Sequence, residues 1–239
     1  MRVRAVLALC VIVMALVAAC SKPTPTPAST DSPAPSTTPT QSSVEELTAD
    51  EILAASKAAL SAAGSFRMRL SARVGIFTSE STIDYVGADA KGTQKQLDSV
   101  VEFVLVDGSL YVKAGDSYSS GISSLRSISF VSGKWVKVSP TNPNHSHLIP
   151  TTDVALFEIG AVTKAGTSTI DGKPVVVLEG SENSTIYVAA QGEPYPIRIE
   201  GTTDTEVGPA TVAMDFSDFG AVTTAIEVPA GEIVDLWAD

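Results

Sequence analysis

Nine consecutive residues, 66–74, alternate strictly between apolar and polar side chains, and this pattern restricts the fold of the chain more than any other feature. The apolar positions are Phe66, Met68, Leu70, Ala72 and Val74, and the polar positions between them are Arg67, Arg69, Ser71 and Arg73. Successive side chains of a β-strand point to opposite faces of the sheet. The period of two therefore predicts a strand with one apolar face and one face in water.

Short strand patterns separated by turn residues fill much of the remaining sequence. We expect strands at residues 81–86, 100–106, 110–113 and 135–138, and again at residues 166–170, 175–179, 185–189, 196–202 and 210–219. The pair Asp107-Gly108 supplies the positive φ angles of a type I′ turn and predicts a hairpin. The last five strands have the spacing of an antiparallel meander. We expect strand pairing to stop at residues 228–232.

A helix is predicted just before the alternating strand. Thr48 and Glu51 fit a capping box, and Gly64 is typical of the position after a helix end. Between them, small and apolar residues recur at spacings of three and four, which indicates one buried stripe: Ile52, Leu53, Ser56, Ala59, Leu60 and Ala63. Three alanines of this helix, Ala55, Ala59 and Ala63, are consistent with a hollow beneath the helix and equally with tight packing on a sheet. A second, short helix is expected at residues 152–160.

The N-terminus has the pattern of an export signal. Two arginines in the first four residues precede an uncharged apolar run at residues 5–19, shorter than the roughly 20 residues that cross a bilayer as a helix. The stretch LVAAC at residues 16–20 resembles a lipobox, which predicts cleavage before Cys20 and acylation of its thiol. The alternative is an ordinary secretory signal that contains a cysteine by chance. Cys10 would leave with the signal, so the mature chain has no disulfide.

These signals divide the chain into three expected regions. They are a lipoprotein signal peptide at residues 1–19, the acylated Cys20 with a disordered Pro/Ser/Thr-rich tether up to residue 43, and a single domain at residues 44–239. The tether would span up to ~70 Å as polyproline II. Two or three acyl chains hold a protein stably on a membrane, which predicts a location on the extracytoplasmic face of the cell membrane.

The charge of the chain excludes one class of partner. The sequence has 16 basic and 27 acidic residues, and without Arg2 and Arg4 the mature chain has a formal charge of −13. Nucleic acid is therefore not expected to bind. We expect a monomer whose contact with the membrane is made through Cys20.

The sequence offers little catalytic chemistry. It contains no G-x-S-x-G, S-x-x-K, H-E-x-x-H, P-loop or EF-hand pattern. His145 and His147, with Asp153 nearby, could hold a metal weakly, but structural sites usually need four ligands and a solvated loop is favoured. We therefore expect no enzyme activity, no metal and no cofactor. The arginines of the alternating strand could meet an anionic headgroup, although the wet face of a sheet is the simpler interpretation.

Several stretches together resemble a known family. They are TADEILAASKAALSAAGSFRMRLSA, VDGSLYVKAG, GKWVKVSP, TSTIDGKPVVVLEG and IYVAAQGEPYPIRIEG, following the lipobox and the tether. In element order and in these stretches the chain is similar to the actinobacterial LppX/LprAFG lipoproteins, whose fold resembles that of the LolA/LolB lipoprotein carriers. The resemblance implies an α+β fold, with a strongly curved antiparallel sheet forming half a barrel and helices covering its concave face.

The same resemblance implies an apolar cavity that takes the acyl chains of a lipid or glycolipid. The candidate cavity-facing residues are Ile52, Leu53, Ala59, Leu60, Phe66, Met68 and Leu70. The expected function is that of a membrane-anchored extracytoplasmic lipoprotein that binds and moves lipids. The alternative is a non-catalytic envelope accessory or sensor domain that acts through protein contacts and has a packed interior without a lipid cavity.

Overall fold

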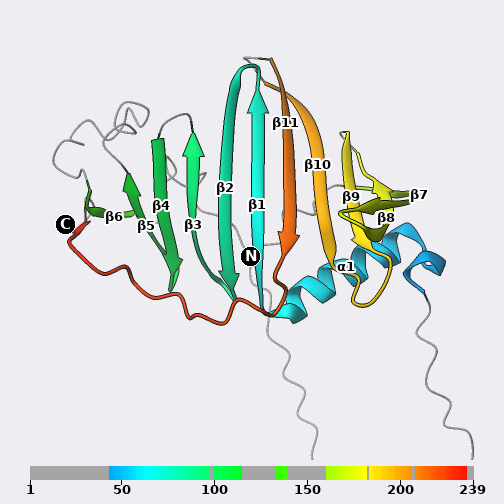
Figure 1. The fold of residues 1–239 in the computed structure, drawn as a ribbon, viewed down its shortest axis with the longest axis horizontal. Helices are drawn as coiled ribbons and strands as arrows, with labels where there is room; N and C mark the ends of the chain where they lie inside the picture. Colours follow the sequence, from blue (N-terminus) through cyan, green and yellow to red (C-terminus); the bar gives the residue numbers. More distant parts are fainter. Residues whose placement is uncertain are drawn as a thin grey trace, which may run out of the picture. The chain divides into compact units, whose positions relative to one another are not determined.

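One twelve-stranded β-sheet organises the part of the chain that the structure describes (Figure 1). The structure is a computed structural model and describes residues 43–96, 99–114, 133–138, 160–181, 183–205 and 208–235. The sheet is large, curved and unclosed, and its strand order is β12-β6-β5-β4-β3-β2-β1-β11-β10-β9-β8-β7. The fold is therefore mostly β, with few helices.

The sheet consists of two meanders joined in the middle. The first contains β1 Ser65–Val74, β2 Phe77–Val86, β3 Asp89–Gln96, β4 Ser99–Val106, β5 Ser109–Ala114 and β6 Trp135–Val138. The second contains β7 Thr163–Ile170, β8 Lys173–Glu179, β9 Ser184–Ala189, β10 Pro196–Thr205 and β11 Gly208–Ser217. Antiparallel pairing of β1 with β11 joins them and places Met68 opposite Phe216.

Most of the predicted strands are confirmed. The Asp107-Gly108 turn has φ angles of 51° and 70°, as a type I′ turn requires, and it connects β4 to β5. Residues 228–232 belong to no strand, as predicted, but they do not end the pairing, because β12 Ile233–Asp235 follows and pairs in parallel with β6. Strand β3 was not predicted, since its residues are almost all polar and show no apolar alternation.

The two faces of the sheet differ in polarity. On β1 the apolar residues of the alternating pattern point to one face and the arginines to the other, as predicted. The register continues the apolar face across the neighbouring strands, with Ile83 on β2 and Phe216 on β11 opposite Met68. Buried residues of this face form the main hydrophobic cluster. A smaller cluster on the polar face buries Val104, Val106, Tyr111 and Ile226.

Helix α1, Ala49–Ala63, packs on the apolar face. Its buried residues Ile52, Leu53 and Leu60 belong to the main hydrophobic cluster, and the helix contacts β7 and β10. A short 3-10 helix, η1 Val44–Glu46, precedes it. Several helices were expected over the concave face, but α1 is the one α-helix among the described residues, and the expected short helix at 152–160 lies outside them. No helix in the described ranges is long and apolar enough to cross a membrane.

The capping box at the start of α1 makes stability depend on pH. Thr48 N–H donates to Glu51 Oε2 at 2.9 Å, and this bond, with that of the Thr48 hydroxyl, lowers the pKa of the Glu51 carboxyl. The carboxylate's contribution to stability is thus present above its unfolded-state pKa and is lost as pH falls through the lowered folded-state pKa. Glu51→Gln keeps a capping-box side chain but does not titrate. Denaturant unfolding at several acidic pH values should show that this variant loses less stability than the wild type on acidification, and equal losses would contradict the assignment.

A buried hydroxyl on α1 predicts a stabilising substitution. Ser56 is fully buried, and its Oγ has no hydrogen-bond partner among the described residues. An unsatisfied buried hydroxyl is costly, so Ser56→Ala should raise the free energy of unfolding by about 1 kcal/mol. Ser61→Ala, on the exposed side of the same helix, is the matched control for helix propensity. A gain no larger than that of the control, measured by urea unfolding, would show that the Ser56 hydroxyl is satisfied.

Candidate functional site

The seven predicted cavity-facing residues lie on the same side of the sheet. Ile52, Leu53, Ala59, Leu60 and Met68 are buried, whereas Phe66 and Leu70 are half-buried. All except Ala59 belong to the main cluster or pack directly against it. Their role in lining a lipid cavity stays a prediction.

A groove opens between the end of α1 and the β2–β3 turn. It has a volume of about 310 Å³ and is lined by Lys57, Leu60, Ser61, Gly64, Phe66, Gly87 and Ala88. Two of the predicted residues, Leu60 and Phe66, therefore line the same groove. The other five are not part of its lining, and four of these are buried in the interior beside it.

Two glycines form one end of this groove. Gly64 ends α1 in the left-handed conformation at φ 69°, and Gly87 turns β2 into β3 at φ 60°. The Gly87 N–H donates to the Gly64 carbonyl oxygen at 2.8 Å. The sequence marked Gly64 as a helix end, but it contained no sign that Gly87 and Ala88 would meet it. These residues leave the groove open because they are small, and no sequence motif identifies a residue by this property.

Phe66, the aromatic residue that lines the groove, is backed by a second, buried ring. Phe66 stacks on Tyr85, with ring centroids 4.6 Å apart and an interplanar angle of 22°. Tyr85 is buried, and burial raises the pKa of its hydroxyl to about 12. The buried Tyr85 hydroxyl is neutral at physiological pH, and the Phe66 ring offers an apolar surface to a ligand.

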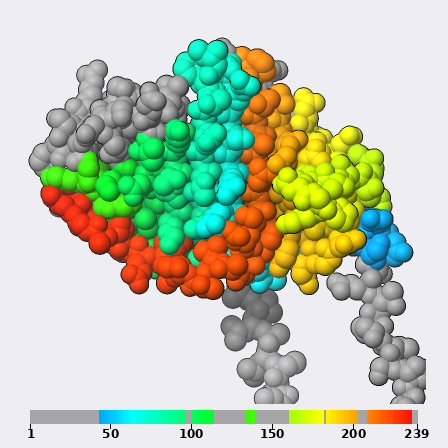
Figure 2. All heavy atoms as spheres, viewed as in Figure 1, coloured from blue at the N-terminus to red at the C-terminus, as the bar shows by residue number. Residues whose placement is uncertain are grey.

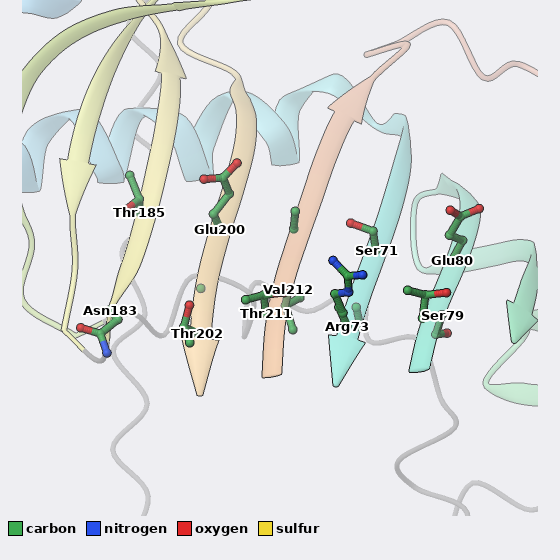
Figure 3. A pocket seen from close by; sticks show the side chains of 14 residues that line it. Ser71, Arg73, Ser79, Glu80, Asn183, Thr185, Glu200, Thr202, Thr211 and Val212 are labelled. Carbon is green, nitrogen blue, oxygen red and sulfur yellow. The ribbon is translucent and has the colours of Figure 1, made fainter. Parts of the chain in front are cut away.

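The opposite, polar face carries a wider hollow of about 710 Å³ (Figure 3). Strands β1, β2, β9, β10 and β11 contribute its lining, in which hydroxyl and amide side chains surround one arginine and two carboxylates. Figure 3 labels these polar residues, Ser71, Arg73, Ser79, Glu80, Asn183, Thr185, Glu200, Thr202 and Thr211. The described residues contain neither His nor Cys, and no group of three acidic residues among them is placed to hold a metal. This hollow provides polar contacts without an evident nucleophile.

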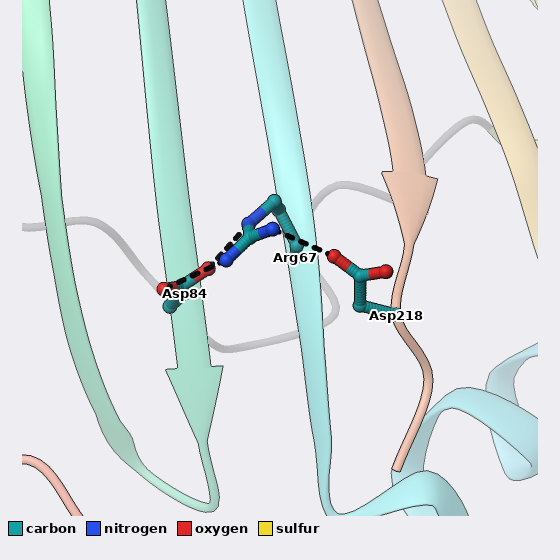
Figure 4. Close-up of polar contacts among 3 residues, drawn as sticks. All are labelled: Arg67, Asp84 and Asp218. Atoms are coloured by element: carbon teal, nitrogen blue, oxygen red, sulfur yellow. Dashed lines mark hydrogen bonds and ion pairs between the residues drawn. The ribbon is translucent and has the colours of Figure 1, made fainter. Parts of the chain in front are cut away.

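Ion pairs neutralise some of the arginines on the polar face. Arg67 Nε donates to Asp84 Oδ1 at 2.7 Å, and Arg67 Nη1 donates to Asp218 Oδ2 at 2.8 Å (Figure 4). The hydrogen bond with Asp84 raises the pKa of Arg67 further. Arg69 and Arg73, the other two arginines of β1, make no ion pair with any residue that the structure describes.

Several predicted features lie outside the described residues. These are the lipidation site Cys20, the tether and the loop with His145, His147 and Asp153. Acylation of Cys20 stays a prediction.

Comparisons with known proteins identify the fold. No protein-family model matches the chain, and no curated protein matches it. The crystal structure of LprF from Mycobacterium bovis matches with a TM-score of 0.50 and 16% sequence identity, over 76% of this chain and 96% of that one. The chain has the LprF fold. The predicted resemblance to the LppX/LprAFG lipoproteins is thus confirmed at the level of the fold.

Two further solved structures are more distant than LprF. An uncharacterized conserved protein from Thermus thermophilus matches with a TM-score of 0.39 and 11% identity, over 78% of this chain and 98% of that one. The MucA/MucB complex of Pseudomonas aeruginosa matches with a TM-score of 0.36 and 15% identity, over 70% and 55% of the two chains. In the LprF fold of the present chain, the groove lies where α1 runs into β1.

Proposed function

We propose that this protein is a lipoprotein, acylated on Cys20 and held on the extracytoplasmic face of the cell membrane, that binds the acyl chains of a lipid or glycolipid and passes the lipid on. Residues 44–239 form its single α+β domain, a half-barrel whose concave face is covered by helices. The protein is monomeric and non-catalytic. Residues 20–43 tether it to the membrane.

The apolar groove beside α1 carries this proposal. Leu60 and Phe66 line it, and its volume of about 310 Å³ lies at the lower end of the ~300–1,000 Å³ range of small-molecule sites. An alkyl chain gains free energy from such a place because it leaves water, at about 0.8 kcal/mol per buried CH₂. The LprF fold supports the same interpretation. The polarity of the opposite face also supports it, because the apolar side chains of the sheet lie on the face against which α1 packs.

Native mass spectrometry tests lipid binding directly. The chain with Cys20→Ser, which cannot be acylated, is purified from the periplasm of a lipid-rich bacterial host and sprayed under native conditions. We expect a second population heavier by the mass of one lipid, whose class is then read after extraction. Bare protein in every preparation would favour the alternative, an accessory or sensor domain that acts through protein contacts.

Filling the groove should abolish lipid binding without unfolding the protein. Ala88 is exposed in the β2–β3 turn and lines the groove, so the indole of Ala88→Trp should occupy the space of the acyl chain. Ala54→Trp, on the exposed side of α1 and away from the groove, is the matched control. We expect the lipid adduct to fall at least ~10-fold in Ala88→Trp, which corresponds to a loss of about 1.4 kcal/mol, and to persist in Ala54→Trp. Equal occupancy in both variants would show that the lipid binds elsewhere.

A further inference from the structure

The turn between β1 and β2 exposes two large apolar side chains. Ile76 has 86% of its surface in water and Phe77 has 52%. Gly75 precedes them with a φ angle of 58° and is the first central residue of a tight hairpin turn. Such a turn tolerates polar residues after the glycine, so it does not require an apolar residue at position 76. Ile76 contributes almost nothing to the core, so the fold itself does not account for this residue.

The β1–β2 turn also lies at an extreme of the sheet. Figure 1 shows that β1 and β2 reach further at this end than β3, β4, β5 and β9. The space-filling view in Figure 2 shows the same end of the hairpin protruding at the upper edge of the described surface. A flat surface that approached the sheet from this direction would meet Ile76 and Phe77 early.

A cation lies close to the turn in sequence, on the polar face of β1, whereas Phe77 pairs with Val74 on the apolar face. Arg73 is exposed on the polar face of β1, and its register partner on β2 is Thr78, the residue after Phe77. Unlike Arg67, it makes no ion pair with a described residue. Its guanidinium is thus available to a phosphate, which it can bind through two hydrogen bonds.

This combination fits a lipid surface better than a protein partner. A stable protein interface buries about 800 Å² on each side, whereas two side chains of this size offer at most roughly half of that. A short apolar tip with an arginine nearby on the polar face of the hairpin is suited to the headgroup region, where the apolar atoms enter the acyl boundary and the cation stays with the phosphates. Contact through two side chains alone would be weak. The proposed tether compensates for this because it would hold the tip near the membrane at about millimolar effective concentration.

We infer that the β1–β2 turn inserts Ile76 and Phe77 into the membrane surface while Arg73 binds lipid phosphate, so that the anchored protein docks on the bilayer at this turn. The inference rests on the proposed anchoring through Cys20 and is independent of the groove. It gives the tethered domain a defined orientation on the membrane.

A fluorescent probe at the turn tests the inference in the full acylated chain. The thiol of Ile76→Cys carries an environment-sensitive fluorophore, and the protein is reconstituted into vesicles of equal parts phosphatidylcholine and phosphatidylglycerol. Gln191→Cys, exposed in the β9–β10 turn, is the matched control position. We expect a blue shift and quenching by a spin-labelled lipid at position 76 but not at position 191. Phe77→Ser and Arg73→Gln, each added to Ile76→Cys, should reduce the shift.

Each outcome has a separate meaning. If the chain floats with the vesicles but the two positions respond alike, the inference is wrong and the anchoring stands. A chain that does not float with vesicles overturns the anchoring and the docking together. A blue shift at position 76 that appears equally in concentrated protein without vesicles would mean that a second copy covers the turn, and it would also overturn the inference. Unchanged melting temperatures would exclude unfolding as the cause of a lost shift.

Discussion

Gly92→Ala is expected to lower the free energy of unfolding by about 2–3 kcal/mol, a large effect for one added methyl group. A Cβ at this position of β3 would overlap with the Thr82 carbonyl oxygen and would lie 2.8 Å from the Phe103 Cζ. The first contact is the decisive one, because Thr82 belongs to the backbone of β2, which is paired with β3. The strand cannot withdraw without weakening hydrogen bonds in the middle of the sheet.

Gly201→Ala is the matched control for this prediction. Gly201 lies in β10, also in an extended conformation, and a Cβ there would meet nothing within 4 Å. We expect a change within about 0.5 kcal/mol, since no contact opposes the methyl group. Urea unfolding of the two variants and the wild type makes the comparison. Equal losses in both variants would show that β2 and β3 are not packed as closely as the structure describes.

Ile52→Ala is expected to cost about 2–5 kcal/mol, as large-to-small substitutions in a packed core do. Ile52 is fully buried in the first turn of α1 and belongs to the main hydrophobic cluster with residues of the sheet. It therefore fixes the start of the helix whose other end forms the groove. Loss of this contact should lower the denaturant midpoint while leaving the slope unchanged, because the surface exposed on unfolding hardly changes.

The same chemical change at the β1–β2 turn provides the control. Ile76→Ala removes the same atoms from a side chain that is almost entirely in water, so its effect on unfolding should be within about 0.5 kcal/mol. If Ile52→Ala cost no more than Ile76→Ala, then α1 would not be packed on the sheet. The groove would then have no second wall, and the proposed lipid site would fail with it.

The ends of α1, strand β1 and the β4–β5 hairpin could be predicted from the sequence, because each of them depends on a few neighbouring residues. The capping box between Thr48 and Glu51 and the glycine at position 64 fix the ends of α1 within a few residues. The alternation at residues 66–74 predicted both the strand and its apolar face. Asp107-Gly108 predicted a hairpin because few residue pairs adopt the φ angles that its turn requires.

The partners of these elements could not be predicted in the same way. A period of two tells which residues share a face, but not that β1 would pair with β11, which is more than a hundred residues away. Strand β3 has no apolar alternation because small residues, Ala90 and Gly92, serve on its inner face beneath larger neighbours. Strand β12 follows a proline and glycine stretch that normally ends pairing.

Two of the seven residues that line the groove were predicted as cavity-facing. Leu60 and Phe66 are among the residues that the family resemblance suggested as cavity-facing, and both line the groove. Gly87 and Ala88 lie in a turn whose position beside α1 depends on the tertiary fold. Their contribution is their small size, and sequence motifs identify functional groups, which these two residues lack.

Photo-cross-linking with a long-chain fatty acid that carries a diazirine near its methyl end is the most direct measurement of where an acyl chain lies. After irradiation and digestion, we expect the label on peptides that contain Leu60 and Phe66, with competition by unlabelled fatty acid and loss of the label in Ala88→Trp. Label found mainly on the strands that line the polar hollow, or retained at full strength in Ala88→Trp, would contradict an acyl-chain site beside α1.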